Sequence, residues 1–336
     1  MAQPTLTFPR PVFAKLSPHP FLLRSLCPQS ESDPAGRTNG RAPREARSIN
    51  IHTSSLSHAH GSAVIRTGDT TVICGVRAEV LPVASIPQFR PRAAFEEETE
   101  TSKRAELKNY DLLVPNIELA TGCAPQFLPG VPPTALAQTL STRVYSLLHG
   151  SGMVDVEDLR IWKRQKKEGE MEVDEDGEEE REEQELVGYW VLYVDLLFVS
   201  FDGNPFDAAW TAVVAALKDT KLPVARWDTE REAVVCSRES RPLKVRGLPV
   251  ACSAAVFLEK EYGEPGEGRH WILLDPDRLE ETLCREVITM VVDCSSGETR
   301  IRAIEKQGGT VVGRELLRGF AGVAEQRWKE VSKAMQ

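Results

Sequence analysis

The residues that could carry chemistry lie at a turn after the most apolar segment of the chain. Asp202 and Gly203 follow the run YWVLYVDLLFVSF, and Asn204, Pro205 and Phe206 come next. A carboxylate at the end of a buried strand can hold a metal ion or position a proton. The interpretation favoured here is a plainer one, in which Asp202 forms the turn and caps the following helix.

Two other clusters could carry chemistry. His52, His58 and His60 contain a His-x-His spacing, which can bind a metal ion, but they stand among Ser and Thr residues, so we interpret them as surface or turn histidines. Glu280 and Glu281 could act as paired carboxylates. They begin a predicted helix, however, where acidic side chains interact favourably with the helix dipole. The sequence therefore predicts no metal site and no cofactor.

Charge is distributed very unevenly along the 336 residues. The formal net charge is −9, and residues 168–185 alone contribute −11, which leaves +2 for the rest of the chain. A near-neutral remainder neither indicates nor excludes contact with nucleic acid. The acidic run could bind basic partners, in the manner of a chaperone. Its composition is more typical of a solvated insert that cannot bury enough apolar surface to become ordered.

Composition also limits where such a chain works. The seven cysteines are odd in number and form no C-x-x-C pair, which argues against a disulfide or zinc framework and favours a reducing compartment. No window approaches 18 consecutive apolar residues, so no membrane span is expected. The N-terminus lacks the basic and apolar regions of a secretory signal.

The elements that position these residues follow from the apolar pattern. Residues 62–68 and 70–81 predict a hairpin that turns at Gly68-Asp69. A helix is predicted from the N-cap Thr134 to about residue 149, and the run at 189–201 predicts a strand covered on both faces. After it, Phe206 and Trp210 begin the apolar face of a helix. Further strands and a helix at 313–334 follow, so two β-rich halves, each with helices, predict an α+β fold.

Several strings occur together in an order typical of one family: FAKLSPHPFLLRSL, GSAVIRTGDTTVICGVRAEV, LLVPN, VDLLFVSFDGNPFDAAWTAVVAAL, LLDPDRLEE and AIEKQGGTVVGRELL. With them the chain resembles the RNase PH-like subunits of the eukaryotic RNA exosome over roughly residues 10–325. The N-terminal arm and the VPN stretch favour the ribosomal RNA-processing protein 43 branch. The resemblance implies an internally duplicated fold and localisation to the nucleus, nucleolus and cytoplasm.

The resemblance also implies partners. Family members form heterodimers with other RNase PH-like subunits, and three such pairs build a hexameric ring. Oligonucleotide-binding cap subunits sit on the ring, and RNA passes through its channel to a separate hydrolytic ribonuclease. Within this chain we expect a docking arm at residues 1–26 and one RNase PH-like domain at 27–335. That domain would carry a polar insert at about 88–108 and a disordered acidic insert at about 163–187.

Active members of the family cleave RNA from the 3′ end with phosphate as the nucleophile, and the matching positions here are degenerate. Gly247 in LKVRGLPVA stands where an active-site carboxylate is expected. Asn204, Pro205 and Phe206 replace a phosphate-binding loop that contains arginine. Gln138 is the nearest match to an arginine of the preceding helix. Each loss would cost about a hundredfold or more in rate, so the resemblance implies a subunit without catalysis.

The main hypothesis is therefore a structural ring subunit that lines the RNA channel and holds its partners. Candidate RNA contacts are Arg90, Arg92, Lys103 and Arg104 in the polar insert, with a solvated loop as the alternative. Two rival functions stay open at this point. One is an active phosphate-dependent 3′-to-5′ exoribonuclease, and the other is an acidic, chaperone-like binding protein.

Overall fold

The structure is a computed structural model, and it describes residues 9–28, 35–87, 89, 99–128, 130, 132–164, 184–260, 269–309 and 313–335. Its helices are α1 (Arg10–Leu16), α2 (Pro18–Leu26), α3 (Glu100–Asn109), α4 (Ala135–Ser151), α5 (Pro205–Asp219), α6 (Arg278–Leu283) and α7 (Arg314–Ala334), with short 3₁₀ turns at Val83–Ser85 and Val156–Asp158. Its strands are β1 (Ile49–Thr53), β2 (Gly61–Thr67), β3 (Thr70–Pro82), β4 (Leu113–Leu119), β5 (Arg160–Arg164), β6 (Gln184–Ser200), β7 (Lys221–Asp228), β8 (Ala233–Pro242), β9 (Val250–Leu258), β10 (His270–Leu274), β11 (Glu286–Asp293) and β12 (Arg300–Gln307).

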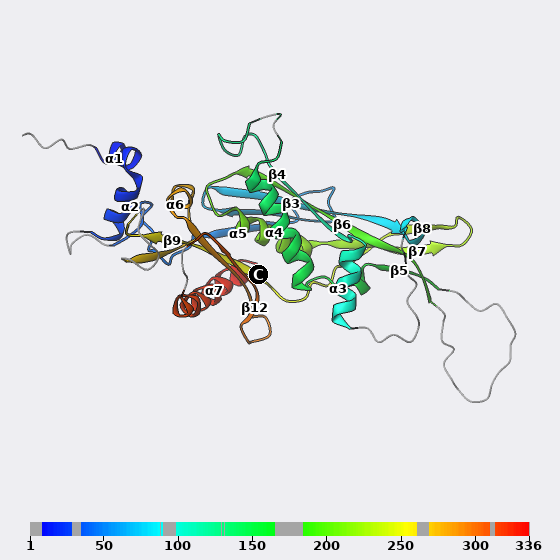
Figure 1. Cartoon of the computed structure of the whole chain (residues 1–336). Coiled ribbons are helices and arrows are strands. Elements are labelled where there is room, and N and C mark those ends of the chain that lie inside the picture. Colours follow the sequence, from blue (N-terminus) through cyan, green and yellow to red (C-terminus); the bar gives the residue numbers. More distant parts are fainter. Residues whose placement is uncertain are drawn as a thin grey trace, which may run out of the picture.

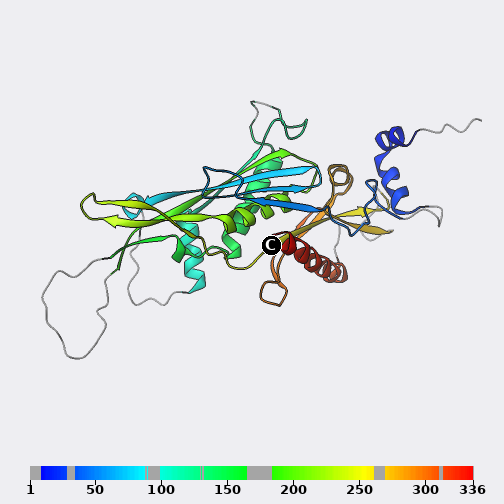
Figure 2. The same cartoon turned by 180° about the vertical axis from the view of Figure 1, so that it is seen from behind.

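The larger sheet has the strand order β1-β2-β3-β6-β4, and β5 pairs with the start of β6. Within it β4 and β6 run parallel, while its other pairs are antiparallel. The predicted hairpin is confirmed, because Thr67 of β2 pairs with Thr70 of β3 across the Gly68-Asp69 turn. Figure 1 shows α4 and α5 in front of this sheet, and Figure 2 shows the same strands from behind.

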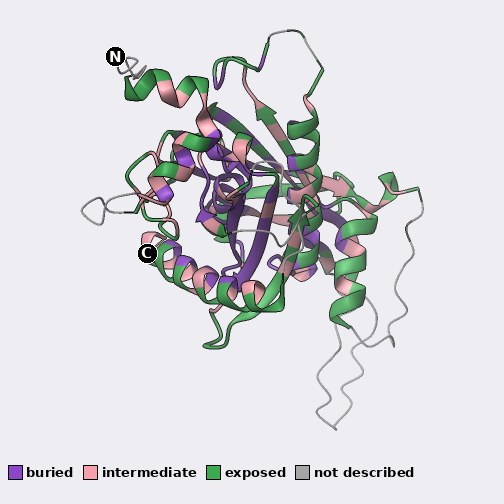
Figure 3. Cartoon of the chain, turned by 60° about the vertical axis from the view of Figure 1, so that its left-hand side comes forward, coloured by how far each residue is buried: buried purple, intermediate pink, exposed green. Residues whose placement is uncertain are grey.

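Helix α5 is the centre of the core. Its Trp210 has no exposed surface, and the indole N–H donates to the carbonyl oxygen of Pro249 at 2.9 Å. Helix α4 begins at the predicted N-cap, because the Thr134 hydroxyl accepts the N–H of Ala137. Buried residues gather between the helices and the sheets (Figure 3). Helix α5, which follows the loop after β6, is therefore anchored in the core.

A second sheet, in the order β10-β9-β11-β12, forms the other half, and α7 packs on it. Phe320 and Ala324 of α7 are buried against Met290 and Cys252 of this sheet. The two predicted β-rich halves are thus observed, each with its helices. Strands β7 and β8 form a separate two-stranded hairpin.

The N-terminal arm packs on the second sheet. Leu22 and Leu26 of α2 are buried with Phe257 and Leu273, and the His19 ring lies 4.6 Å from the Phe257 ring. Helix α1 has no buried residue and extends beyond α2 (Figure 1). The short helical turns expected in the arm are therefore two consecutive helices.

Three local predictions need correction. The polar insert predicted at 88–108 contains helix α3, which Thr99 caps by accepting the N–H of Ser102. The acidic insert predicted at 163–187 is shorter, because β5 continues to Arg164 and β6 begins at Gln184; its residues 165–183 lie outside the described residues. Strand β6 was predicted to be covered on both faces. Within this chain residues 188–192 are buried in succession, so both faces are covered there, whereas further along the strand Leu197 and Val199 are 38% and 48% exposed.

None of the helices in the described ranges is long and apolar enough to cross a membrane.

Candidate functional site

The loop between β6 and α5 has a backbone that few residues could adopt. Gly203 has a φ of 75°, and a Cβ there would lie 2.5 to 2.7 Å from backbone atoms of residues 276–278. Asn204 has a φ of 47° and stands at the N-cap of α5, and Pro205 follows as the first helical residue. The loop is therefore pressed against the segment that leads into α6.

Three carboxylates from separate elements meet at Asn204. Its side-chain Nδ2 donates to Asp207 of α5 at 2.9 Å and to Asp275 after β10 at 2.8 Å. Its backbone N–H donates to Glu281 of α6 at 2.7 Å. The position predicted to replace part of a phosphate loop is thus a hydrogen-bond donor to acidic side chains.

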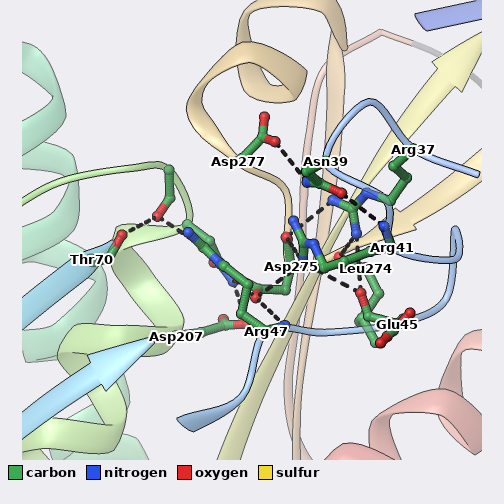
Figure 4. Close-up of polar contacts among 12 residues, drawn as sticks. Arg37, Asn39, Arg41, Glu45, Arg47, Thr70, Asp207, Leu274, Asp275 and Asp277 are labelled. Carbon is green, nitrogen blue, oxygen red and sulfur yellow. Dashed lines mark hydrogen bonds and ion pairs between the residues drawn. The ribbon is translucent and has the colours of Figure 1, made fainter. Parts of the chain in front are cut away.

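Arg47 makes the closest cationic contacts to this group (Figure 4), and Arg41 also pairs with Asp275, at 3.6 Å. The Nε and Nη2 atoms of Arg47 donate to the two carboxylate oxygens of Asp275 at 2.9 and 2.8 Å, a bidentate pair. Its Nη1 donates to the backbone oxygen of Asp202 at 2.7 Å. Burial raises the pKa of Asp275, but the hydrogen bonds and the charge of Arg47 outweigh burial and lower that pKa to about 2. Asp202 contacts Arg47 instead of capping α5, so its predicted capping role is wrong.

A second buried ion pair lies beside the first. Arg37 donates through Nε to Glu280 at 2.7 Å and through Nη1 to the carbonyl oxygen of Leu274 at 2.6 Å. Neither Arg37 nor Glu280 has exposed side-chain surface. Glu280 also forms a capping box with Asp277 at the start of α6, as the helix-start interpretation predicted. Glu280 therefore has a second, buried role that the sequence did not predict.

The electrostatics of this cluster disfavour an incoming anion. Burial raises the pKa of Glu281 to about 7. Burial also raises the pKa of Asp207, although hydrogen bonds from Asn204 and Ser253 lower it. A phosphate entering the loop would approach these carboxylates, while the guanidinium of Arg47 is already bound to Asp275. The arrangement fixes the loop in place but does not form an anion clamp.

The arginine that approaches the loop from helix α4 is Arg143, which sequence comparison missed. Its guanidinium lies 3.8 Å from the centre of the Phe206 ring, and it donates to Thr289 at 3.0 Å and pairs with Glu305. The position matched from sequence, Gln138, is exposed and donates to the carbonyl oxygen of Pro133 at 3.1 Å. The one sequence signal for Arg143 is its position on the same predicted helix, five residues after Gln138.

Gly247 has no room for the carboxylate that the family pattern expects. Its φ is 72°, and a Cβ there would lie 2.4 Å from Oδ2 of Asp293. Asp293 is itself fully engaged, because it accepts hydrogen bonds from Leu248, Ser295 and Arg302. Glycine at this position therefore leaves room for Asp293, which links the end of β11 to the loop before β9.

The predicted RNA contacts are only partly described. Arg90 and Arg92 lie outside the described residues. Lys103 and Arg104 lie on α3, where Lys103 pairs with Asp155 at 3.8 Å and is 17% exposed, while Arg104 is exposed. Of these two, Arg104 is the one whose position suits a contact with a phosphate backbone.

No group of His, Cys, Asp and Glu side chains able to hold a metal ion occurs in the part of the chain that the structure describes. Within the histidine cluster, Nδ1 of His60 accepts the backbone N–H of Ala78 at 3.1 Å. That bond gives His60 a local structural role.

Comparison with known proteins gives this geometry a family. The model of the 3′ exoribonuclease family, domain 1, matches residues 45–223, which include β1 to β6, α5 and the loop between them. The chain belongs to that family. It is 31% identical over 325 residues to the exosome complex component rrp43 of Schizosaccharomyces pombe, covering 96% of this chain and 97% of the relative. It is 29% identical to the exosome complex component Rrp42 of Methanothermobacter thermautotrophicus, covering 86% of each chain.

Solved structures agree on the fold. The Archaeoglobus fulgidus exosome with RNA bound to the active site matches with a TM-score of 0.65 at 23% identity and covers 97% of this chain. An archaeal exosome core matches with a TM-score of 0.59 at 21% identity. The resemblance to RNase PH-like exosome subunits and the RNase PH-like fold predicted from sequence are both confirmed.

Proposed function

We propose that this chain is a non-catalytic, structural subunit of an RNA exosome core ring. It would support 3′-to-5′ processing and degradation of RNA, including ribosomal RNA maturation and mRNA turnover, by holding partner subunits and lining the channel. The observation that carries the proposal is the loop at Asn204. In a chain of the 3′ exoribonuclease family, that loop is bound by Asp207, Asp275 and Glu281 instead of presenting free cations to phosphate.

The partners follow from the relatives, which are named as components of the exosome complex. The chain would pair with another RNase PH-like subunit inside a hexameric ring, beneath oligonucleotide-binding cap subunits and next to a hydrolytic ribonuclease. Such a complex would work in the nucleus, nucleolus and cytoplasm. Residues 1–26 would dock on the assembly, and residues 27–335 would form one domain.

RNA in the channel would contact the polar insert through Arg90, Arg92, Lys103 and Arg104. Contacts to phosphate are independent of sequence and weaken as salt rises. Since Lys103 is paired with Asp155, we assign the larger share of this contact to Arg90, Arg92 and Arg104. The measurement is crosslinking of the assembled complex to RNA at two salt concentrations, followed by peptide mapping.

The test of the absent catalysis is phosphorolysis. The purified chain, alone and in its complex, is given 3′-hydroxyl RNA and phosphate, and release of nucleoside diphosphates is measured. We expect no release from the chain alone, and Asp202→Asn should leave any activity of the complex unchanged. If this substitution abolishes diphosphate release by the complex, the chain is an active exoribonuclease and the structural role is wrong.

The acidic run at 168–185 gives a separate test. If the chain acts as an acidic binding protein, deletion of this run abolishes its main interaction. If it acts as a ring subunit, the deleted chain still assembles. Native mass spectrometry of both forms, purified from the source cells, reports the partners and the stoichiometry directly.

A further inference from the structure

The turn that precedes β1 contains the one Asn-Gly pair of the sequence, Asn39-Gly40. Asn-Gly is a common turn dipeptide. It is also a pair in which the backbone nitrogen of the second residue can attack the side-chain amide of the first, because glycine has no Cβ to block the approach. Whether this reaction has room depends on the surroundings of Gly40.

Gly40 lies in open space at the surface. Its φ is 86°, and no atom from elsewhere in the described chain lies within 4 Å of the place a Cβ would take. Asn39 is exposed as well. The other described pair with this chemistry is Asp202-Gly203, where a Cβ would lie 2.5 to 2.7 Å from backbone atoms of residues 276–278. Of these two pairs, Asn39-Gly40 is therefore the one with space for a five-membered ring.

The hydrogen bonds of Asn39 connect the turn to α6. Its Nδ2 donates to Oδ2 of Asp277 at 2.9 Å (Figure 4), and its Oδ1 accepts the N–H of Arg41 at 3.1 Å. Asp277 is the N-cap of α6, where its carboxylate accepts the N–H of Glu280 at 2.9 Å. The amide of Asn39 thus joins the turn to the first residues of α6, beside the buried pair of Arg37 with Glu280.

We propose that Asn39 is a site of spontaneous deamidation, and that its conversion loosens the attachment of the segment 35–48 to α6. The backbone nitrogen of Gly40 attacks Cγ of Asn39. A C–N bond forms, the bond from Cγ to Nδ2 breaks, and ammonia leaves with the proton of the Gly40 nitrogen. Water then opens the cyclic imide at either carbonyl carbon, which gives aspartate or isoaspartate. No electrons are exchanged.

Both products disturb the turn. Aspartate places a carboxylate where the amide donated to Asp277, so a hydrogen bond is lost and two like charges face each other. Isoaspartate adds one carbon to the backbone of a turn that is closed by the N–H of Arg37 donating to the oxygen of Arg41 at 2.8 Å. Either change alters the turn that positions Arg37 for its contact with Glu280.

The fold also sets the rate of conversion. The N–H of Gly40 donates to the carbonyl oxygen of Arg37 at 3.0 Å, and this bond has to open before the ring can close. Hydrogen bonds in exposed turns open locally without unfolding of the domain. We therefore expect folded chain to convert more slowly than unfolded chain. Because the attacking nitrogen has to lose its proton, conversion should be faster at pH 8 than at pH 6.

The first experiment measures the modification itself. Full-length chain is incubated at pH 6 and pH 8, and a third sample is unfolded in guanidinium chloride at pH 8. Peptide mapping by mass spectrometry quantifies aspartate and isoaspartate at position 39. The internal control is Asn109, which is also exposed but is followed by Tyr110. We expect conversion of Asn39 in all three samples, fastest in the unfolded one, and an intact amide at Asn109 in the folded samples. If Asn39 keeps its amide in the folded chain while the unfolded chain converts, the turn protects it and the proposed site is wrong.

The second experiment measures the consequence. Asn39→Asp should lower the melting temperature by about 1 to 3 °C and speed hydrogen exchange in peptides that cover 35–48 and 277–283. Asn109→Asp should match wild type in both measurements. Incubation at pH 8 should shift wild type in the same direction but leave Asn39→Gln unchanged, because the longer side chain closes its ring far more slowly. If Asn39→Asp melts and exchanges like wild type, the bond to Asp277 does not hold the segment, and the proposed loosening is wrong even where Asn39 converts.

Discussion

Asp275 offers the sharpest test of how the loop beside α5 is held. Asp275→Asn keeps the shape of the side chain but removes the charge that pairs with Arg47 at 2.8 Å. Both side chains are nearly buried, at 3% and 9% exposed. The pair therefore lies where the loss of one partner leaves an uncompensated charge.

The magnitude follows from the pKa of Asp275, which is lowered from 3.8 to about 2 in the folded chain. Because the folded pKa lies below the unfolded value, ionisation stabilises the fold above pH 4, and that stability is lost as pH falls toward 2. At 1.36 kcal/mol per pKa unit, the contribution at pH 7 is about 2.5 kcal/mol. At pH 3 about half of it remains.

The assay is urea unfolding of wild type and Asp275→Asn at pH 7, 5 and 3. We expect the free energy of unfolding to differ by about 2 to 4 kcal/mol at pH 7 and by clearly less at pH 3. The matched control is Glu79→Gln, because Glu79 is 52% exposed and its pair with Arg77 lies in solvent. It should change stability by less than about 1 kcal/mol. A gap between wild type and Asp275→Asn that is the same at pH 3 and pH 7 would refute the reasoning.

Three further predictions concern the same region. The folded pKa of Glu281, about 7, lies above the ordinary 4.5, so ionisation of Glu281 opposes folding at high pH. Glu281→Gln should therefore become more stable relative to wild type as pH rises from 5 to 8, by up to about 3 kcal/mol. Urea midpoints of both proteins measure this, and a difference between them that is equal at pH 5 and pH 8 would contradict it. Trp210→Ala should lower the free energy of unfolding by about 3 to 5 kcal/mol, and a loss below about 1 kcal/mol would show that its burial contributes little. Gly247→Asp should lower the melting temperature and yield no phosphorolysis, since the new Cβ would meet Asp293; diphosphate release by this variant would show that the site can be restored.

Local elements were largely predictable from the sequence, because their signals are local. The N-cap at Thr134 and the turn at Gly68-Asp69 occur where propensity and apolar periodicity place them. Helix α3 was missed because its sequence, ETSKRAELKN, is polar and buries only Leu107. A helix with so little apolar surface gives no periodic signal.

The candidate site was predictable as a place but not as a set of contacts. The loop at Asn204 and the glycine at 247 were found by comparison with family strings. The pairing of Arg47 with Asp275 was not, because 228 residues separate them, and the family string that contains Asp275 does not indicate its partner. Arg143 was missed for a related reason, since Glu305 lies 162 residues further along the chain. Pairs of this kind are set by tertiary packing and leave no trace in local spacing.

The buried arginines near the N-terminus also constrain the order in which the chain can fold. Arg37 and Arg47 are held by Glu280 and Asp275, which emerge from the ribosome more than 200 residues later. At translation rates of about 5 to 20 residues per second, the first half spends roughly 10 seconds or more without these carboxylates. During that interval Arg37 and Arg47 lack these ion-pair partners, so the first sheet forms without these contacts. The ion pairs of Arg37 and Arg47 with Glu280 and Asp275 therefore form late, and they join two halves of the chain that are synthesised at different times.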